Sequence, residues 1–95
     1  MAAPVSITMR IPRELRDLCE GSSTLDLSAS SVWDALDELE RRHPSVHRSI
    51  CDETGRLRRH INVFVNSSLV REREGLDAVL KSGDVITILP AVSGG

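Results

Sequence analysis

The sequence predicts a small α+β domain in which a mixed sheet wraps around one main helix. Short segments of alternating apolar and polar residues lie on both sides of a single amphipathic segment, and the last of them is rich in β-branched residues. Alternation with a period of two indicates a strand with one buried face, whereas apolar residues three and four apart indicate a helix. The length of 95 residues suits a single domain.

The first part of the chain predicts two neighbouring strands. Residues 5–11 alternate between apolar and polar side chains until Pro12, and residues 24–27 form a second candidate strand after a turn at 21–23. Residues 13–19 are expected to be a connection with room for a helical turn. Two strands this close in sequence favour an antiparallel pair.

The main helix is predicted from residue 31 to His43. Ser30 or Ser31 can cap its first turn, and Asp34 occupies the acidic position of a capping box. The expected buried stripe consists of Val32, Ala35, Leu36 and Leu39. Pro44 disfavours helical geometry at His43 and therefore marks the expected end of the helix.

The second half of the chain predicts the return of the sheet. We expect irregular structure over 45–59, strands over 61–65 and 69–70, a helical turn over 75–82 and a last strand over 85–89 that ends at Pro90. A strand pair, a crossing helix and returning strands follow the order of the β-grasp, or ubiquitin-like, fold. The chain therefore divides into a domain over 1–90 and a flexible tail over 91–95.

Composition argues against several classes of function. The formal net charge is -2, which differs from the strongly basic balance of a nucleic-acid-binding domain. No apolar run reaches the ~18–20 residues of a membrane span, and no signal peptide is recognisable at the N-terminus. We therefore expect a cytoplasmic protein that binds neither nucleic acid nor membranes and is a monomer when alone.

No pattern of reactive side chains predicts an enzyme. His43, His47 and Cys51 are spaced four apart, but Pro44 interrupts a helix through them, and no metal site is expected. Cys19 has no activating neighbour in the sequence, so a buried, inert thiol is the preferred interpretation. The basic residues 56–60 suit a solvated loop best, with a docking edge for an acidic partner or for nucleic acid as alternatives.

The C-terminal third resembles the MoaD/ThiS family of sulfur carriers. The resemblance rests on the strand at 61–65, the turn Gly83–Asp84, the strand that follows it, Pro90, and the final Gly94–Gly95. The ending 88–95 is most similar to the CysO-type branch of that family. The resemblance implies a β-grasp fold and a working group at the terminal carboxylate.

The resemblance also implies the chemistry and the partners. A ubiquitin-activating-type adenylyltransferase and sulfurtransferase would use ATP to adenylate Gly95 and convert it to a thiocarboxylate. A downstream biosynthetic enzyme would then accept the sulfur for cysteine or another sulfur-containing metabolite. Gly94, with Ser93 and Val92, would give the tail access to the partner's active site, because glycine lacks a side chain. No cofactor is expected on the chain itself.

A docking surface for the partner is predicted on the outer side of the sheet. Alternation along the third and last strands sends Phe64 and Leu89 away from the helix, and Thr87 and Pro90 complete the expected surface. The alternative is that these are ordinary scattered surface residues. Three other functions remain open: the small subunit of molybdopterin synthase, a ubiquitin-like modifier conjugated through Gly95, and a plain interaction domain.

Overall fold

A computed structural model describes residues 3–70 and 76–90. Its elements are β1 (Val5–Arg10), the 3-10 helix η1 (Arg13–Cys19), β2 (Thr24–Ala29), α1 (Val32–Arg42), α2 (Pro44–Ile50), β3 (Ile61–Val65), β4 (Ser68–Val70) and β5 (Val85–Pro90). Leu76 and Asp77 add a short helical stretch before β5. Within the described residues, none of the helices has the length and apolar character that crossing a membrane requires.

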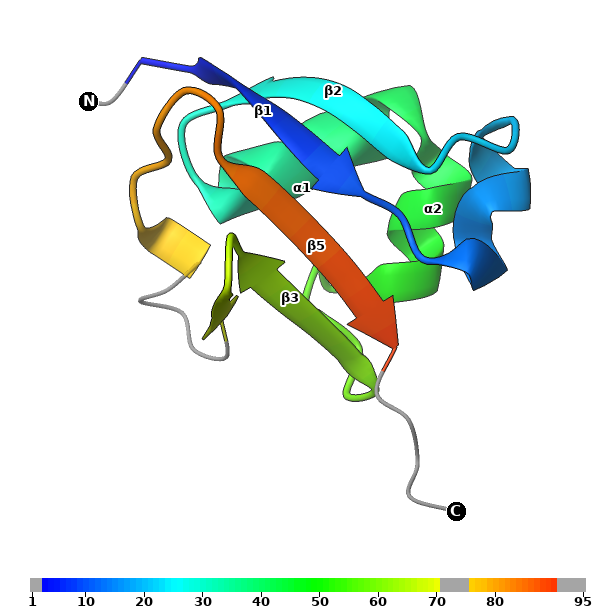
Figure 1. Cartoon of the computed structure of the whole chain (residues 1–95). Helices are drawn as coiled ribbons and strands as arrows, with labels where there is room; N and C mark the ends of the chain where they lie inside the picture. The colour runs from blue at the N-terminus through cyan, green and yellow to red at the C-terminus, as the bar shows by residue number, and fades with distance from the viewer. Residues whose placement is uncertain (1–2, 71–75, 91–95) are drawn as a thin grey trace.

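The five strands form one mixed sheet in the order β2-β1-β5-β3-β4. β5 is parallel to β1 and antiparallel to β3, while β1–β2 and β3–β4 are antiparallel pairs (Figure 1). The predicted N-terminal strand pair and mixed sheet are thus confirmed. The last strand in the sequence occupies the centre of the sheet.

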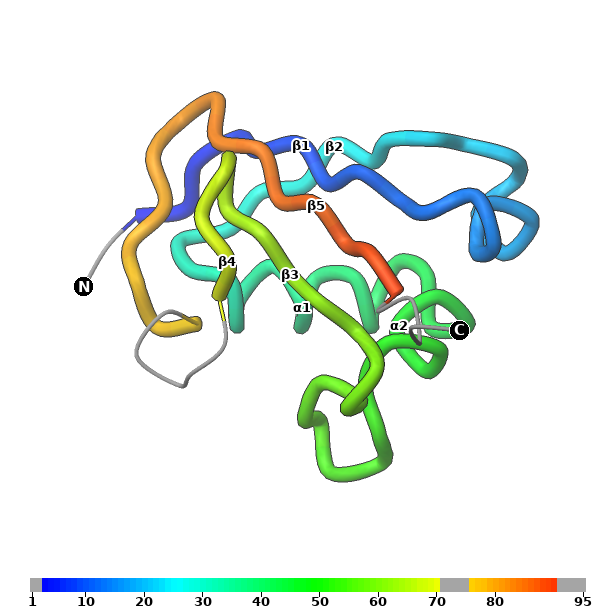
Figure 2. Tube along the Cα trace, turned by 60° about the horizontal axis from the view of Figure 1, so that its bottom comes forward, coloured from blue at the N-terminus to red at the C-terminus, as the bar shows by residue number. Residues whose placement is uncertain are grey.

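The fold has two layers, with the sheet on one side and both α-helices packed against one of its faces (Figure 2). The aliphatic core lies between these layers. Its largest fully buried side chains are Met9, Ile11, Val32, Leu36, Leu39, Val46, Ile50, Cys51, Val63, Ile86 and Ile88. The opposite face of the sheet, which faces the viewer in Figure 1, is not covered by a helix.

Helix α1 begins as the sequence predicts. The Ser31 hydroxyl accepts a hydrogen bond from the backbone N–H of Asp34 at 3.1 Å, and the Asp34 carboxylate accepts one from the backbone N–H of Ser30 at 2.8 Å. Two N-terminal groups that the helix cannot pair internally are thereby satisfied. The helix ends at Arg42, and the expected apolar stripe is buried.

The region after α1 differs from the prediction of irregular structure. Pro44 opens a second helix, α2, because the first helical position needs no N–H donor and suits the fixed φ of proline. Val46 and Ile50 lie on the buried face of α2 and are nearly inaccessible to solvent. The helix is two turns long, so its apolar pattern was too short to stand out in the sequence.

Four strand boundaries also differ from the prediction: β1 ends one residue earlier, at Arg10, β4 begins one residue earlier, at Ser68, and β2 and β5 run further than expected. β2 continues to Ala29, because Ala29 pairs with Val5 at the far end of β1. β5 includes Pro90, which lies opposite Ile61 at the start of β3. Pro90 is thus the last residue of the strand, where the lack of an N–H donor is tolerated.

Candidate functional site

The candidate site begins where β5 ends. β5 pairs with β1 along one edge and with β3 along the other, so the strand that leads to the tail is held on both sides. The side chains of Ile86 and Ile88 point into the core and have no surface exposed to solvent. The predicted tail residues Val92, Ser93, Gly94 and Gly95 lie outside the described residues. The described part of the site therefore ends at Pro90.

The turn that starts β5 is fastened to the turn after β3. The Asn66 side chain accepts a hydrogen bond from the backbone N–H of Val85 at 3.0 Å and donates one to the Asp84 carboxylate at 3.2 Å. Asn66 has a φ of 55° and Gly83 a φ of 90°, a left-handed conformation that glycine and asparagine tolerate. We call this arrangement the Asn66–Asp84 clamp.

The hydrogen bonds of the clamp lower the pKa of Asp84. The backbone N–H of Lys81 donates to the Asp84 carboxylate at 2.8 Å, and this bond, followed by the one from Asn66, holds the pKa of Asp84 below its ordinary value. Hydrogen bonds to the ionised form favour that form. The Gly83–Asp84 pair thus has a structural role in setting where β5 begins.

The uncovered face of the sheet brings three of the four predicted docking residues together. Phe64 lies directly opposite Thr87, and both are half-buried. Leu89 lies on the same face, diagonal to Phe64, and 44% of it is exposed. The expected outward direction of Phe64 and Leu89 is confirmed, although Phe64 is less exposed than an isolated surface residue.

Pro90 does not join the other three. Side chains alternate along a strand, so Pro90 shares the side of Ile86 and Ile88, and it lies half-buried opposite Ile61. This position makes Pro90 the end of the strand and separates it from the outer surface. Its predicted contribution to that surface is not supported by the register.

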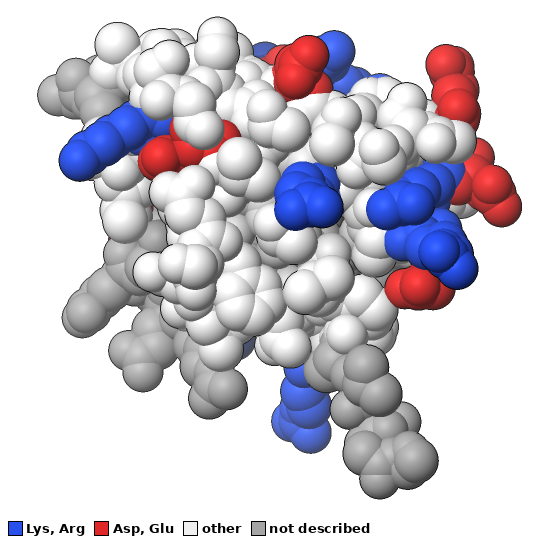
Figure 3. All heavy atoms as spheres, viewed as in Figure 1, with Lys and Arg blue, Asp and Glu red and all other residues white. Residues whose placement is uncertain are grey.

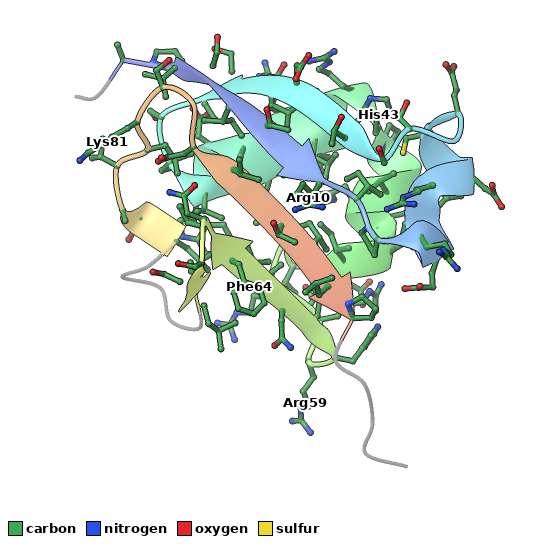
Figure 4. All side chains as sticks on the ribbon, viewed as in Figure 1. Arg10, His43, Arg59, Phe64 and Lys81 are labelled. Carbon is green, nitrogen blue, oxygen red and sulfur yellow. The ribbon has the colours of Figure 1, made fainter. Side chains whose placement is uncertain are left out.

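Sequence reasoning missed further neighbours on the same face, where Asn62 lies directly opposite Leu89. Leu69 lies opposite Phe64 from β4, and Arg10 lies opposite Thr87 from β1. Figure 4 shows Arg10 and Phe64 on the uncovered face of the sheet. Both residues were placed in strands, but only the strand register reveals which side chains are adjacent. We call Phe64, Leu69, Thr87 and Leu89 the outer-face patch.

The nucleophilic and metal-binding residue types lie elsewhere. Cys19 and Cys51 are free and buried. Burial raises the pKa of both thiols, that of Cys51 to about 11. His47 is buried on α2, with its Nδ1 3.7 Å from the Glu40 carboxylate. Among residues 3–70 and 76–90, no group of three or more His, Cys, Asp or Glu side chains is arranged to hold a metal ion.

An open groove of about 1120 Å³ lies on the helix side of the molecule. Trp33 and Leu36 of α1 form one wall, and the loop at 52–57 forms the other. Charged side chains of both signs line it, including Asp37 and Arg48. Its lining is mixed, and the Thr54 hydroxyl within it donates a hydrogen bond to the Asp52 carboxylate at 2.6 Å as part of an exposed turn.

Comparison with known proteins decides the family. Residues 9–95 match the model of the ThiS family, and this match begins near the end of β1 and includes every later element, the clamp and the tail sequence. This chain is a member of the ThiS family. The predicted resemblance to MoaD/ThiS carriers is therefore confirmed.

Relatives of this ThiS-family chain include carriers and modifiers. The sulfur carrier protein CysO of Mycobacterium tuberculosis is 32% identical over 93 residues, covering 96% of this chain and 100% of CysO. Small archaeal modifier protein 1 of Haloferax volcanii is 36% identical over 84 residues, covering 83% of this chain and 92% of that protein.

A solved structure supports the same assignment. A chain of the crystal structure of the Amycolatopsis orientalis BexX/CysO complex is 39% identical, covers 94% of this chain and 99% of its own length, and superimposes with a TM-score of 0.81. The β-grasp prediction is thereby confirmed. The sheet order, the single long helix and the central last strand of this ThiS-family chain are those of a ubiquitin-like domain.

Proposed function

We propose that this chain is a sulfur carrier whose Gly95 carboxylate accepts sulfur as a thiocarboxylate. The observation that carries the proposal is the position of β5, the central strand, which ends five residues before Gly95 in a chain whose family match continues to residue 95. The similarity to CysO of Mycobacterium tuberculosis, a named sulfur carrier, supports it.

The proposed chemistry belongs to the partner enzyme, and this chain is its substrate. A carboxylate is ionised at neutral pH and is a poor electrophile. Its oxygen attacks the α-phosphate of ATP, pyrophosphate leaves, and an acyl adenylate forms on Gly95. A sulfide donor then attacks the acyl carbon and displaces AMP. The resulting thiocarboxylate is a sulfur nucleophile that a separate biosynthetic enzyme can use.

The tail suits delivery of its end into a partner's active site. Five residues beyond Pro90 can reach about 17 Å when extended. Gly94 and Gly95 carry no side chain and can pass a channel that a larger residue would block. Ordering each tail residue costs roughly 1–2 kcal/mol of conformational entropy, so contacts from the folded domain must offset that loss.

The outer-face patch is the proposed source of those contacts. Leu89 is the most exposed of its four residues and lies one position before the end of β5. The BexX/CysO complex of Amycolatopsis orientalis supports the idea that a chain of this kind docks on a partner protein. We propose that the activating enzyme covers the patch while it reads the tail.

A matched pair of variants tests the docking role. Leu89→Asp places a charge in the patch. Val79→Asp places the same charge on an apolar residue that is 66% exposed and lies outside the named strands, bridged to Ser31 beside the start of α1. We expect Leu89→Asp to weaken binding to the activating enzyme at least ~10-fold, as loss of an interface anchor does, and Val79→Asp to leave binding unchanged. Equal effects of the two variants would contradict the role of the patch.

Intact-protein mass spectrometry tests the carrier function. Incubation with a candidate activating enzyme, ATP and a sulfide source should raise the mass by the difference between one sulfur and one oxygen atom. A variant that lacks Gly95 should show no increase. The absence of an ATP-dependent increase in the wild-type chain, with an enzyme that adenylates it, would contradict the proposal.

A protein modifier is the second candidate, favoured by the similarity to small archaeal modifier protein 1 of Haloferax volcanii. The same acyl adenylate would then react with a lysine amine of a target, form an isopeptide bond and release AMP. Both functions share the activation step and diverge after it. Denaturing electrophoresis of an epitope-tagged chain separates them, because only a modifier produces covalent adducts that survive thiol reductant.

A further inference from the structure

Basic side chains lie at the end of the sheet from which the tail leaves. Ile61, the first residue of β3, is opposite Pro90, so Arg59 and His60 directly precede the position where β5 ends. On the other side of β5, Arg10 is the last residue of β1 and lies opposite Thr87. Figure 4 shows Arg59 beside this end of the sheet and Arg10 on its uncovered face.

The loop before β3 is held in place by its own hydrogen bonds. Asp52 accepts bonds from the Thr54 backbone at 2.8 Å, the Thr54 hydroxyl at 2.6 Å and the Arg56 backbone at 3.1 Å. Further along, the Arg58 guanidinium donates to the backbone carbonyl of Arg48 at 3.1 Å. The backbone of this loop and the side chain of Arg58 are therefore held by local hydrogen bonds.

The loop presents an excess of positive charge. A surface hollow of about 450 Å³ is lined by Arg56, Arg58, Arg59 and His60 together with Leu57 and Asp52. The Asp52 carboxylate is engaged by Thr54 and by the backbone, and these bonds lower its pKa. Within the described residues none of the loop arginines forms a salt bridge, and Asp52, whose pKa Arg58 also helps to lower, offsets only part of their charge.

Arg10 extends the positive charge onto the uncovered face. Figure 4 labels Arg10 on this face, and Figure 3, in the same view, shows that the middle of the face is largely uncharged, with few basic or acidic side chains. On η1, in contrast, Arg13 and Arg16 are interspersed with Glu14 and Asp17. We therefore restrict the feature to Arg10, Arg56, Arg58 and Arg59, and call these residues the basic border.

We propose that the basic border recognises carboxylate side chains around the tail channel of the activating enzyme. The proposal rests on the carrier function proposed above, and it specifies that the partner surface around the channel is acidic. Protein interfaces combine a desolvated apolar centre with a polar rim, and complementary rim charges mainly raise the association rate. The outer-face patch supplies such a centre. The basic border flanks it, with Arg10 beside Thr87 on the β1 side and the loop arginines before Ile61, which lies opposite Pro90.

A protein surface fits the border better than nucleic acid does. The whole chain is negative, so a polyphosphate would be repelled beyond the immediate contact. The aromatic residues are Trp33 on α1 and Phe64 on the sheet, and neither belongs to the basic loop, so base stacking has no platform there. Dispersed carboxylates on a protein rim suit four separate arginines.

Two double variants of equal charge test the proposal. Arg10→Gln/Arg59→Gln neutralises the border, and Lys81→Gln/Arg41→Gln removes the same charge from exposed residues outside it. Lys81 lies at the opposite end of the sheet in Figure 4, and Arg41 is in the last turn of α1. The Arg41–Glu38 pair is exposed, so its loss should affect folding little.

The measurement is the association rate constant with the activating enzyme, by stopped-flow fluorescence, as a function of salt. We expect the border variant to associate about 3- to 10-fold more slowly at low salt and the control variant to match the wild type. At about 1 M salt, where the Debye length is ~3 Å, the difference should disappear. The rate of adenylation at saturating carrier should remain normal.

Other results would contradict either the basic border or the carrier function. Equal slowing by both variants would show that only net charge matters and would contradict a localised border. Binding of the wild type to a duplex oligonucleotide at ~0.15 M salt, lost in the border variant, would assign the border to nucleic acid. Normal activation of the border variant with unchanged association rates refutes the border alone. Failure of the wild type to be adenylated refutes the carrier function.

Discussion

Replacing Asn66 by alanine removes the side chain that joins the turn after β3 to the start of β5. Asn66 accepts a hydrogen bond from Val85 and donates one to Asp84, and its backbone N–H also donates to the Val85 carbonyl at 2.7 Å. Alanine keeps the backbone bond and loses both side-chain bonds. It must also adopt the φ of 55° that asparagine tolerates.

The expected loss of stability follows from these two terms. Two hydrogen bonds contribute roughly 0.5–1.5 kcal/mol each, and Asn66 is exposed, so water replaces part of them and the lower end of the range applies. The left-handed conformation costs alanine about 1 kcal/mol. We therefore expect Asn66→Ala to lower the free energy of unfolding by about 2 kcal/mol, a large share of the 5–15 kcal/mol of a typical domain.

Asn66→Gly is the matched control, because glycine adopts a positive φ without strain. It should lose about 1 kcal/mol, the hydrogen-bond part alone. Urea unfolding at neutral pH, followed by circular dichroism, measures both variants. Equal losses of stability in the two variants would show that the positive φ at residue 66 costs alanine nothing. An alanine variant whose free energy of unfolding lies within ~0.5 kcal/mol of the wild type would refute the clamp as a stabilising feature.

Two further predictions concern titratable groups. Because the pKa of Asp84 is lowered in the folded state, its contribution is present above the unfolded pKa of ~3.9 and is lost as pH falls through the folded value. The stability advantage of the wild type over Asp84→Asn should therefore be larger at neutral pH than near pH 3, and a difference independent of pH would contradict this. Cys19 and Cys51 are at most 2% exposed, and burial raises both thiol pKa values. Iodoacetamide should label neither in the native chain at neutral pH but both in urea. Rapid native labelling of either would show that a reactive thiol had been overlooked.

Most of the sheet and the main helix could be predicted from periodicity. The alternation over 5–11, 61–65 and 85–89 and the capped stripe of α1 each depend on local sequence, and the observed elements follow them. Helix α2 could not be predicted in this way, since it places only three residues on a buried face and follows a proline. Its formation depends on packing against elements that are distant in the sequence.

The candidate site could be predicted in part. Alternation gives the direction of Phe64 and Leu89, but cross-strand neighbours depend on register, which the sequence does not specify by itself. The observed register places Leu69 opposite Phe64 and Arg10 opposite Thr87. It places Pro90 on the helix-facing side of the sheet, opposite Ile61. The same limit applies to the basic border, because only the register with β5 places Arg10 beside Thr87 on one side and Arg59 next to the strand end at Pro90 on the other.

The position of the transferred sulfur tests the central claim most directly. Lys81 is the only lysine and no arginine follows it, so trypsin releases residues 82–95 as one peptide that contains the tail and no cysteine. After reaction with the activating enzyme, ATP and sulfide, fragmentation of this peptide should locate one sulfur in place of oxygen on Gly95. Residues 82–95 unchanged in mass, in a chain that the same enzyme adenylates in the presence of sulfide, would contradict the account.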